Sequence, residues 1–186
     1  MDMISVKYLL FLVLVVVVPA AQSQVDEWHD NYGAIGMERV TRLHFYHHET
    51  SSSKDPTVVT MAEAPTTKDS PSFFGLLGMT DNILTEGPEP NSTYLGRAQG
   101  LLAASSREEF TLVMATSFVF KGGNFSGSSL SVLGRNPFMD SVRELPVVGG
   151  TGAFRFARGF AVVKTHWVNA TTHDLIEEYH MTVMHY

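Results

Sequence analysis

The segment from 110 to 120, FTLVMATSFVF, constrains the fold of this chain more than any other feature. It alternates with a period of two, which places one set of apolar side chains on a single face: Phe110, Leu112, Met114, Phe118 and Phe120. Successive side chains of a β-strand point to opposite faces, so this pattern predicts a strand with one face against the core. Helix signals are nearly absent from the rest of the mature chain. The core must therefore be built from sheet.

Further strand signals recur at 39–48, which is rich in β-branched and aromatic residues, and at 57–64, 93–104, 128–133, 154–168 and 175–186. Polar turn segments such as SSSKDP, GPEPNS and KGGNFSG separate them. Residues 65–89 are irregular and rich in glycine and proline, and they predict a long loop with at most one strand near 72–77. The order of elements predicts an antiparallel sheet, as a sandwich or a barrel. Closure into a barrel is favoured because the apolar last strand would otherwise be an exposed edge.

The N-terminus has the pattern of a secretory signal peptide. Lys7 precedes the apolar run YLLFLVLVVVV at 8–18, and small residues follow, so we expect cleavage between Ala20 and Gln24. The run is shorter than the roughly 20 residues that a membrane-spanning helix needs. The sequence thus predicts a signal peptide over 1–23 and a single domain over 24–186, secreted to the extracellular space.

Composition narrows the classes of partner. The net charge is −6 and there is no run of Lys or Arg, so neither nucleic acid nor a membrane surface is an expected partner. The chain has no cysteine, which removes disulfides and thiolate chemistry. Three N-x-S/T sequons, at Asn91, Asn124 and Asn169, lie in turn-like segments and predict glycosylated surface loops.

The segment ELPVVGGTGAFRFARGFA, at 144–161, superficially resembles a nucleotide-binding loop. A dinucleotide site needs G-x-G-x-x-G between a strand and a helix. Here Gly150 and Gly152 are followed by Arg155 where the third glycine should stand, and the residues beyond alternate as in a strand. We therefore expect no cofactor, and we expect these glycines to form a turn or a β-bulge before a long strand.

Four segments carry a resemblance to a known family: LHFYHHE at 43–49, GRAQG at 96–100, LGRNP at 133–137 and VRELPVVGGTGAFRFARGF at 142–160. In this order and spacing the chain resembles the plant dirigent proteins over nearly all of its mature length. The resemblance implies an all-β fold, an eight-stranded antiparallel β-barrel with an apolar central cavity. It also implies a homotrimer secreted into the cell wall space, the apoplast.

The resemblance implies a role in phenylpropanoid metabolism. Lignan-forming members bind phenoxy radicals that a separate oxidase, a laccase or a peroxidase, produces, and they direct the stereochemistry of coupling without redox activity of their own. Our leading expectation is this auxiliary role. A cyclase or dehydratase acting on quinone methides, as in pterocarpan formation, is the alternative. A non-catalytic defence or wall-binding protein is a third class.

The resemblance also selects residues. Glu49 stands where lignan-forming members carry an aspartate, and Arg143 matches the family arginine before the acidic residue of R-[DE]-L. We expect both in the cavity, Glu49 for proton exchange and Arg143 for hydrogen bonds to a phenolic oxygen. The alternatives are a solvated turn residue for Glu49 and a structural ion pair for Arg143, with Glu144 or Glu49.

Three further positions are expected to contact the substrate: Phe45, Leu102 and Asn136. Lignan-forming members carry a tyrosine in place of Leu102 and an aspartate in place of Asn136. Asparagine cannot act as a general acid or base, although it still forms hydrogen bonds. These departures make pinoresinol-type coupling less expected and favour another phenolic substrate or a cyclase-like role.

The histidines raise the question of a metal site. His44, His47 and His48 lie in one predicted strand, with His44 and His48 on one face, and His180 and His185 lie in another. No zinc-site spacing such as H-E-x-x-H occurs. We therefore expect structural histidines and no metal.

Overall fold

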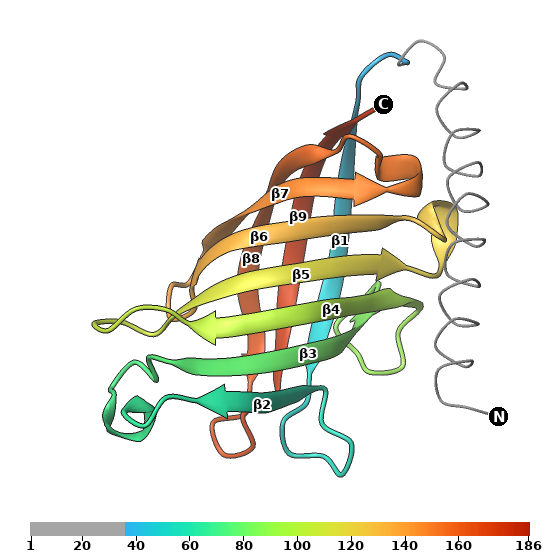
Figure 1. Cartoon of the computed structure of the whole chain (residues 1–186). Coiled ribbons are helices and arrows are strands. Elements are labelled where there is room, and N and C mark those ends of the chain that lie inside the picture. Colours follow the sequence, from blue (N-terminus) through green and yellow to red (C-terminus); the bar gives the residue numbers. More distant parts are fainter. Residues whose placement is uncertain (1–35) are drawn as a thin grey trace, which may run out of the picture. The chain divides into compact units, whose positions relative to one another are not determined.

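The computed structural model describes residues 36–186, and almost all of their regular structure is β-strand (Figure 1). The strands are β1 (Arg39–Glu49), β2 (Val58–Glu63), β3 (Leu76–Thr85), β4 (Tyr94–Ala104), β5 (Thr111–Phe120), β6 (Ser129–Pro137), β7 (Arg143–Thr151), β8 (Arg158–Val168) and β9 (Leu175–His185). Three short 3-10 helices occupy Thr67–Asp69, Gly123–Phe125 and Gly152–Phe154. The predicted signal peptide, 1–23, lies outside the described residues. Within residues 36–186, no helix is long and apolar enough to cross a membrane.

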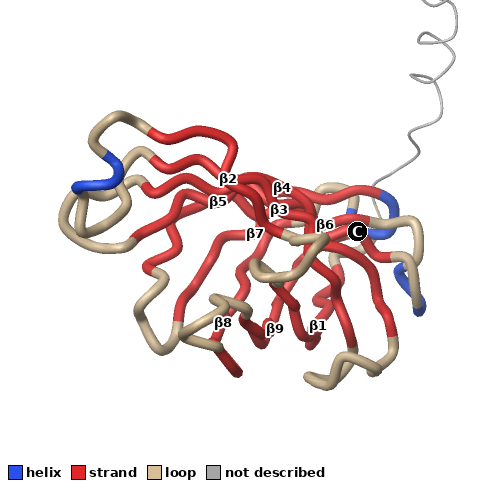
Figure 2. The backbone as a smooth tube through the Cα atoms, turned by 90° about the horizontal axis from the view of Figure 1, so that it is seen from below, coloured by secondary structure: helices blue, strands red, loops and turns tan. Residues whose placement is uncertain are grey.

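Eight of the strands close into an antiparallel barrel. Neighbouring strands follow the order β1-β9-β8-β7-β6-β5-β4-β3, and a direct pairing of β1 with β3 completes the ring (Figure 2). The closing contact joins residues 46–48 of β1 to residues 83–85 of β3. The predicted eight-stranded barrel is thus confirmed. The ninth strand, β2, lies outside the ring and pairs with the first half of β3.

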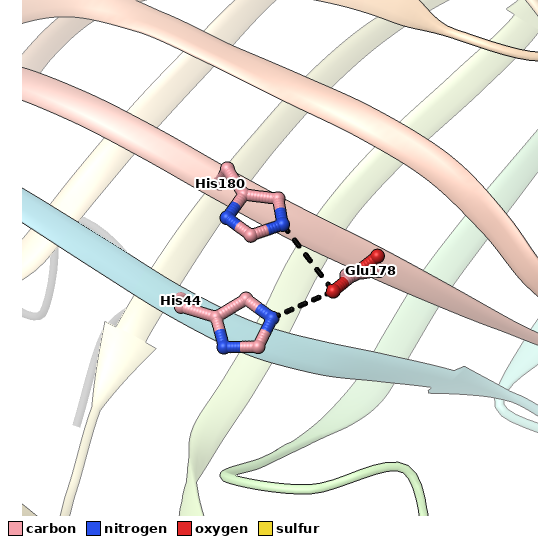
Figure 3. Close-up of side chains that lie close together, drawn as sticks. All are labelled: His44, Glu178 and His180. Carbon is pink, nitrogen blue, oxygen red and sulfur yellow. Dashed lines mark hydrogen bonds and ion pairs between the residues drawn. The ribbon is translucent and has the colours of Figure 1, made fainter.

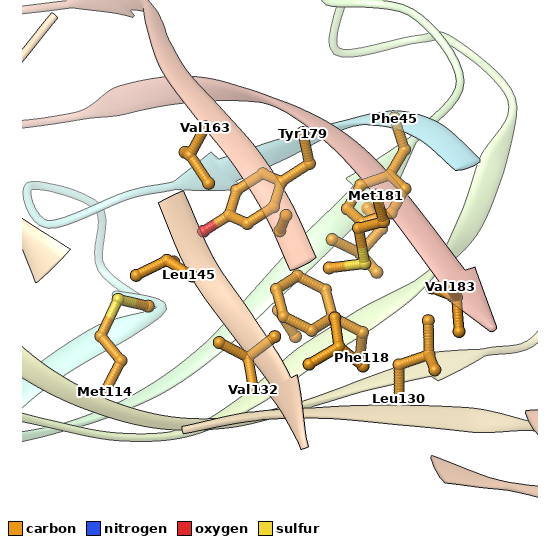
Figure 4. Close-up of a cluster of buried hydrophobic side chains, with 14 of the residues drawn as sticks. Phe45, Met114, Phe118, Leu130, Val132, Leu145, Val163, Tyr179, Met181 and Val183 are labelled. Atoms are coloured by element: carbon orange, nitrogen blue, oxygen red, sulfur yellow. The ribbon is translucent and has the colours of Figure 1, made fainter. Parts of the chain in front are cut away.

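The barrel core confirms the alternation that predicted β5. The side chains of Leu112, Met114, Phe118 and Phe120 are buried, while Val113 on the opposite face is exposed. Phe118 packs against Phe45, Tyr179, Met181 and other apolar side chains that fill one half of the barrel (Figure 4). Aromatic side chains of this size bury a large area, so this half is a solid core.

Strand β3 corrects the prediction of a long loop over residues 65–89. The strand was missed because its inner face, which would normally read as apolar, carries Gly78, Thr80 and Asn82 between Leu76 and Leu84. The side chains of β3 alternate between the two faces of the sheet, but the hydropathy of the sequence does not alternate with them. Two of these polar residues, Thr80 and Asn82, line the cavity described below.

The glycine-rich segment contains a strand that was not predicted, β7, and β8 begins at Arg158, later than the predicted 154. The register of β6 against β7 shifts between Ser131 and Val132, which places a bulge at Val148, as the glycines led us to expect. Pro146, which has no N–H to donate, lies where the β6–β7 pairing ends. Gly134 of β6 accommodates it, since a Cβ on Gly134 would lie 2.7 Å from Pro146 Cδ.

Candidate functional site

A cavity of about 490 Å³ occupies the half of the barrel that the core leaves open. It begins where the inner face of β5 changes from Phe118 to Thr116, Met114 and Leu112. Most of its wall is apolar, and its size suits one small organic ligand. Its lining residues come from most strands of the barrel and from the loops at this end: His47, Glu49, Ser51, Val58, Thr60, Phe73, Leu76, Thr80, Asn82, Leu102, Phe110, Leu112, Met114, Thr116, Asn136, Phe138, Val168, His173, Leu175 and Glu177.

Part of the cavity wall is formed by β2 and by residues at the turn that joins β8 to β9. Strand β1 pairs with β9 only as far as Glu49 and Leu175, and β2 continues along β3 with no partner on its other side among residues 36–186. Asp174 joins this turn to the β1–β2 loop, because its carboxylate accepts hydrogen bonds from the backbone N–H of Ser51 at 2.7 Å and of Ser52 at 3.2 Å. Burial raises the pKa of Asp174, but the hydrogen bonds from the Ser52 hydroxyl, at 2.9 Å, and from the backbone N–H of Ser51 are among those that outweigh burial and hold this pKa below its ordinary value.

The side chain of Glu49, from the end of β1, lies in the wall of the cavity. It follows His47 on the inner face of β1, and its Oε2 accepts a hydrogen bond of 3.2 Å from Asn82 Nδ2. Burial raises the pKa of this carboxyl, and the nearby Glu177 raises it further, against the opposing effects of His47 and Asn82. A carboxyl with a raised pKa in an apolar cavity can exchange a proton with a bound ligand.

Behind Glu49 a chain of buried polar groups runs across the wall. Asn82 Nδ2 also donates to His47 Nε2 at 2.8 Å, so in this arrangement the neutral imidazole carries its proton on Nδ1. His47 Nδ1 lies 3.2 Å from Glu177 Oε2, which is within ion-pair distance, although the contact is too bent for a hydrogen bond. Glu177 Oε1 in turn accepts a hydrogen bond of 2.8 Å from Arg143 Nη1. This series of contacts links the buried cation of Arg143 to the carboxyl of Glu49 at the cavity wall, through Glu177, His47 and Asn82.

The charge of Glu177 is stabilised by its partners. Burial opposes its ionisation, but the contacts with His47 and Arg143 outweigh burial and hold its pKa below the ordinary value. Tyr179 donates to Glu177 Oε2 at 3.3 Å, and burial raises the pKa of its phenol well above the ordinary value, so this hydroxyl keeps its proton. Arg143 also donates to Thr165 Oγ1 at 3.0 Å and lies over the ring of Phe138.

The structure separates the predicted site residues into two groups. Glu49, Leu102 and Asn136 line the cavity. Arg143 is fully buried behind Glu177, in an ion pair with that residue and with neither Glu144 nor Glu49. Phe45 is not part of the wall, because it packs one step deeper among the core aromatics.

Asn136 is a polar position in an otherwise apolar part of the wall. It is 1% exposed, and its Nδ2 contacts Met114 Sδ at 3.0 Å. Its Oδ1 has no hydrogen-bond partner within the described residues, and the same is true of Asn82 Oδ1 on the other side of the cavity. A buried carbonyl oxygen without a partner costs free energy, so both oxygens are available to a donor on a ligand.

Sequence reasoning missed Asn82, Glu177 and the role of His47. Asn82 lies in the region predicted as a loop. Glu177 is the first of two adjacent glutamates, and only the alternation of β9, with Leu175, Tyr179 and Met181 buried, identifies it as the inward-facing member. The predicted glycosylation positions behave as surface residues: Asn91 and Asn124 are exposed and Asn169 is partly exposed.

Comparison with known proteins identifies the family. The family model described as "Dirigent-like protein" matches residues 40–184. Dirigent protein 23 of Arabidopsis thaliana is 42% identical over 179 residues, 96% of each chain. Pterocarpan synthase 1 of Glycyrrhiza echinata is 46% identical over 151 residues, 80% of each chain. The solved structure of a pterocarpan synthase dirigent protein superposes with a TM-score of 0.76 at 44% identity, covering 83% of this chain and 89% of the other. The chain therefore belongs to the dirigent family.

Proposed function

We propose that this protein catalyses the stereoselective cyclisation of a phenolic substrate through a quinone methide, with Glu49 as the proton-transfer group. The observation that carries the proposal is the position of the Glu49 carboxyl in the wall of a largely apolar cavity, where it accepts a hydrogen bond from Asn82 and is connected through His47 to the buried Arg143–Glu177 pair. Burial raises the pKa of this carboxyl, which suits it to proton transfer. The 46% identity to a pterocarpan synthase supports the same choice, which reverses the order expected from the sequence.

The proposed chemistry is a net loss of water without oxidation. Protonated Glu49 donates its proton to the hydroxyl of a hydroxybenzyl alcohol, the benzylic C–O bond breaks, and water leaves. The phenol of the same ring returns a proton to the Glu49 carboxylate, which leaves a neutral quinone methide. A second phenol of the substrate then adds to the benzylic carbon, and its proton restores the first phenol. The carboxyl ends in its original protonation state.

Substrate recognition would rest on the free carbonyl oxygens of Asn82 and Asn136. Each lies in the wall without a partner among the described residues, and a phenolic O–H is a suitable donor. The apolar side chains of Leu102 and Leu112 would contact the aromatic rings. Holding the two reacting rings in one arrangement sets the stereochemistry, and a difference of about 1.4 kcal/mol between two arrangements gives a tenfold preference.

The second candidate is stereoselective coupling of phenoxy radicals supplied by a separate oxidase. The largely apolar wall and the 42% identity to a dirigent protein over 96% of the chain favour it. In this role the cavity acts by orientation alone, and the protonation state of Glu49 is not decisive.

One pair of variants separates the two candidates. The purified protein is incubated with a racemic hydroxybenzyl-alcohol substrate that carries a second phenol, and the products are resolved by chiral chromatography. We expect Glu49→Gln to lose at least 100-fold of the rate, the low end of a general acid–base contribution. Glu63→Gln, an exposed glutamate of β2, is the matched control and should keep wild-type turnover. Full activity in Glu49→Gln rejects the cyclase proposal. Enantioselective coupling of coniferyl alcohol by an added laccase, unchanged in that variant, supports the second candidate.

We further propose secretion to the apoplast, glycosylation at the three sequons and assembly as a homotrimer. The proposal of an oligomer is supported by an apolar row on the outer surface, where Val59, Met79, Leu101, Ala115 and Leu133 are successive partners across β2 to β6. Four of these side chains are at least 38% exposed. Light scattering should give a trimer for the wild type and a monomer for Leu101→Lys, while Met139→Lys, in an exposed turn, stays trimeric.

A further inference from the structure

A cluster of His44, Glu178 and His180, the outer histidine cluster, lies on the outside of the barrel wall (Figure 3). His44 belongs to β1, and Glu178 and His180 belong to β9. Their neighbours in sequence, Phe45, Glu177 and Tyr179, point inward. The cluster is therefore separated from the cavity by the sheet itself, and the proposed function makes no use of it.

The pairing of β1 with β9 builds this cluster. His44 and His180 are direct partners in the antiparallel register, and Glu178 lies two residues before His180 in β9, on the same face. The two imidazole rings stack with centroids 4.4 Å apart at an angle of 17°. Both rings direct Nε2 at the carboxylate: His44 Nε2 lies 2.9 Å and His180 Nε2 3.3 Å from Glu178 Oε1 (Figure 3).

We propose that the outer histidine cluster binds a divalent transition-metal ion, such as Zn²⁺, through His44 Nε2, His180 Nε2 and the Glu178 carboxylate. Imidazole and carboxylate are ligand types that Zn²⁺ accepts at about 2.0–2.2 Å, with a water in a remaining position. Two ligands at about 2.05 Å in tetrahedral geometry lie about 3.3 Å apart. The separations of 2.9 and 3.3 Å from Glu178 Oε1 are close to this requirement, and the candidate ligand atoms all lie within 4.8 Å of one another.

The surroundings set the conditions for binding. The hydrogen bond from His44, followed by the charges of His180 and His44, lowers the pKa of Glu178 against a smaller effect of burial, which keeps the ligand in its carboxylate form. The Tyr46 hydroxyl donates a hydrogen bond to Glu178 Oε1 at 3.3 Å, which helps to hold the carboxylate in position. Lys164 stands opposite Glu178 on β8, Arg42 precedes His44 on the same face, and the ring of His166 packs on Tyr46. The positive charges of Lys164 and Arg42 oppose a bound cation, and protons compete with the metal for the two imidazole nitrogens, so affinity should fall as the pH is lowered.

Calorimetric titration of the untagged full-length protein with ZnCl₂ at pH 7.5 tests the proposal. We expect one Zn²⁺ per chain and at least a tenfold loss of affinity in each of His44→Gln, His180→Gln and Glu178→Gln. The control is His173→Asn, an exposed histidine of the β8–β9 turn whose positive φ of 60° asparagine tolerates. Since the cluster residues are not part of the core, circular dichroism should show all variants folded.

A spectroscopic measurement identifies the ligands directly. With one equivalent of Cu²⁺, the electron paramagnetic resonance spectrum should show coupling to two imidazole nitrogens in the wild type and in His173→Asn. It should show one such nitrogen in His44→Gln and in His180→Gln. Wild-type Zn²⁺ affinity in both histidine variants, loss of binding in His173→Asn, or no saturable Zn²⁺ binding by the wild type would each overturn the proposal.

Discussion

The buried pair of Arg143 and Glu177 should be the most sensitive electrostatic element of the barrel. The side chain of Arg143 is fully buried and that of Glu177 is 4% exposed, so each charge depends on the other. Removing one partner of a buried pair costs about 3–5 kcal/mol, because the remaining charge stays uncompensated. In Arg143→Met the carboxylate keeps His47 Nδ1 at 3.2 Å. We therefore expect the low end, about 3 kcal/mol, which corresponds to a decrease in Tm of roughly 6–12 °C for a domain of this size.

Urea denaturation at pH 7 of Arg143→Met, Glu177→Leu and the double variant forms a double-mutant cycle. The double variant removes both charges, so the two single losses should not add, and we expect a coupling energy of at least about 1 kcal/mol. The pKa of Glu177 is below its ordinary value of 4.5 in the folded protein. Its contribution is thus complete above that pH and is lost as the pH falls through the lower native pKa. A single Arg143→Met loss under about 1 kcal/mol, or strict additivity, would refute the reasoning.

Two further predictions concern stability. Burial raises the pKa of Glu49, so the folded state holds this proton more tightly than the unfolded state does. The folded protein therefore loses stability as the pH rises from 4.5 through the native pKa. Glu49→Gln should have a higher Tm than the wild type at pH 7 but not at pH 4, and an equal difference at both pH values would contradict this. A Cβ on Gly100 would lie 2.1 Å from the backbone oxygen of Ala115, so Gly100→Ala should cost about 3 kcal/mol or more in a urea titration. Gly149→Ala, where nothing lies within 4 Å of the added Cβ, is the control, and comparable losses in both variants would be inconsistent with the close approach.

The sequence contained most of the fold. Strand β5 alternates with a period of two, and β1, β4 and β9 contain apolar or β-branched residues at alternate positions, so the hydropathy pattern identifies these strands directly. It could not show β3 and β7, for two different physical reasons. The inner face of β3 is polar because it borders the cavity, and β7 contains Pro146 and a glycine pair at the position of a bulge.

The candidate site was accessible from the sequence only in part. The resemblance selected Glu49 and Arg143, but their connection depends on contacts between residues far apart in the sequence. Arg143 and Glu177 are 34 positions apart and His47 and Asn82 are 35 positions apart. The outer histidine cluster was missed for the same reason. Its ligands come from β1 and β9, which are 134 residues apart for His44 and Glu178, so no linear spacing reveals them.

The way in which the ring is closed has a consequence for ligand exchange. Strand β1 holds β9 through eleven residue pairs but holds β3 through three, Tyr46 with Thr85, His47 with Leu84 and His48 with Ile83. The hydrogen bond of 2.6 Å between His48 Nε2 and Thr85 Oγ1 reinforces this short junction. Local opening is easiest where the fewest backbone bonds must break together, so the amides of this junction should exchange with solvent sooner than those of β1 against β9. The junction includes the wall residue His47 and is next to the wall residue Asn82 in β3. Local opening at this junction can therefore admit or release a rigid aromatic molecule without unfolding of the core.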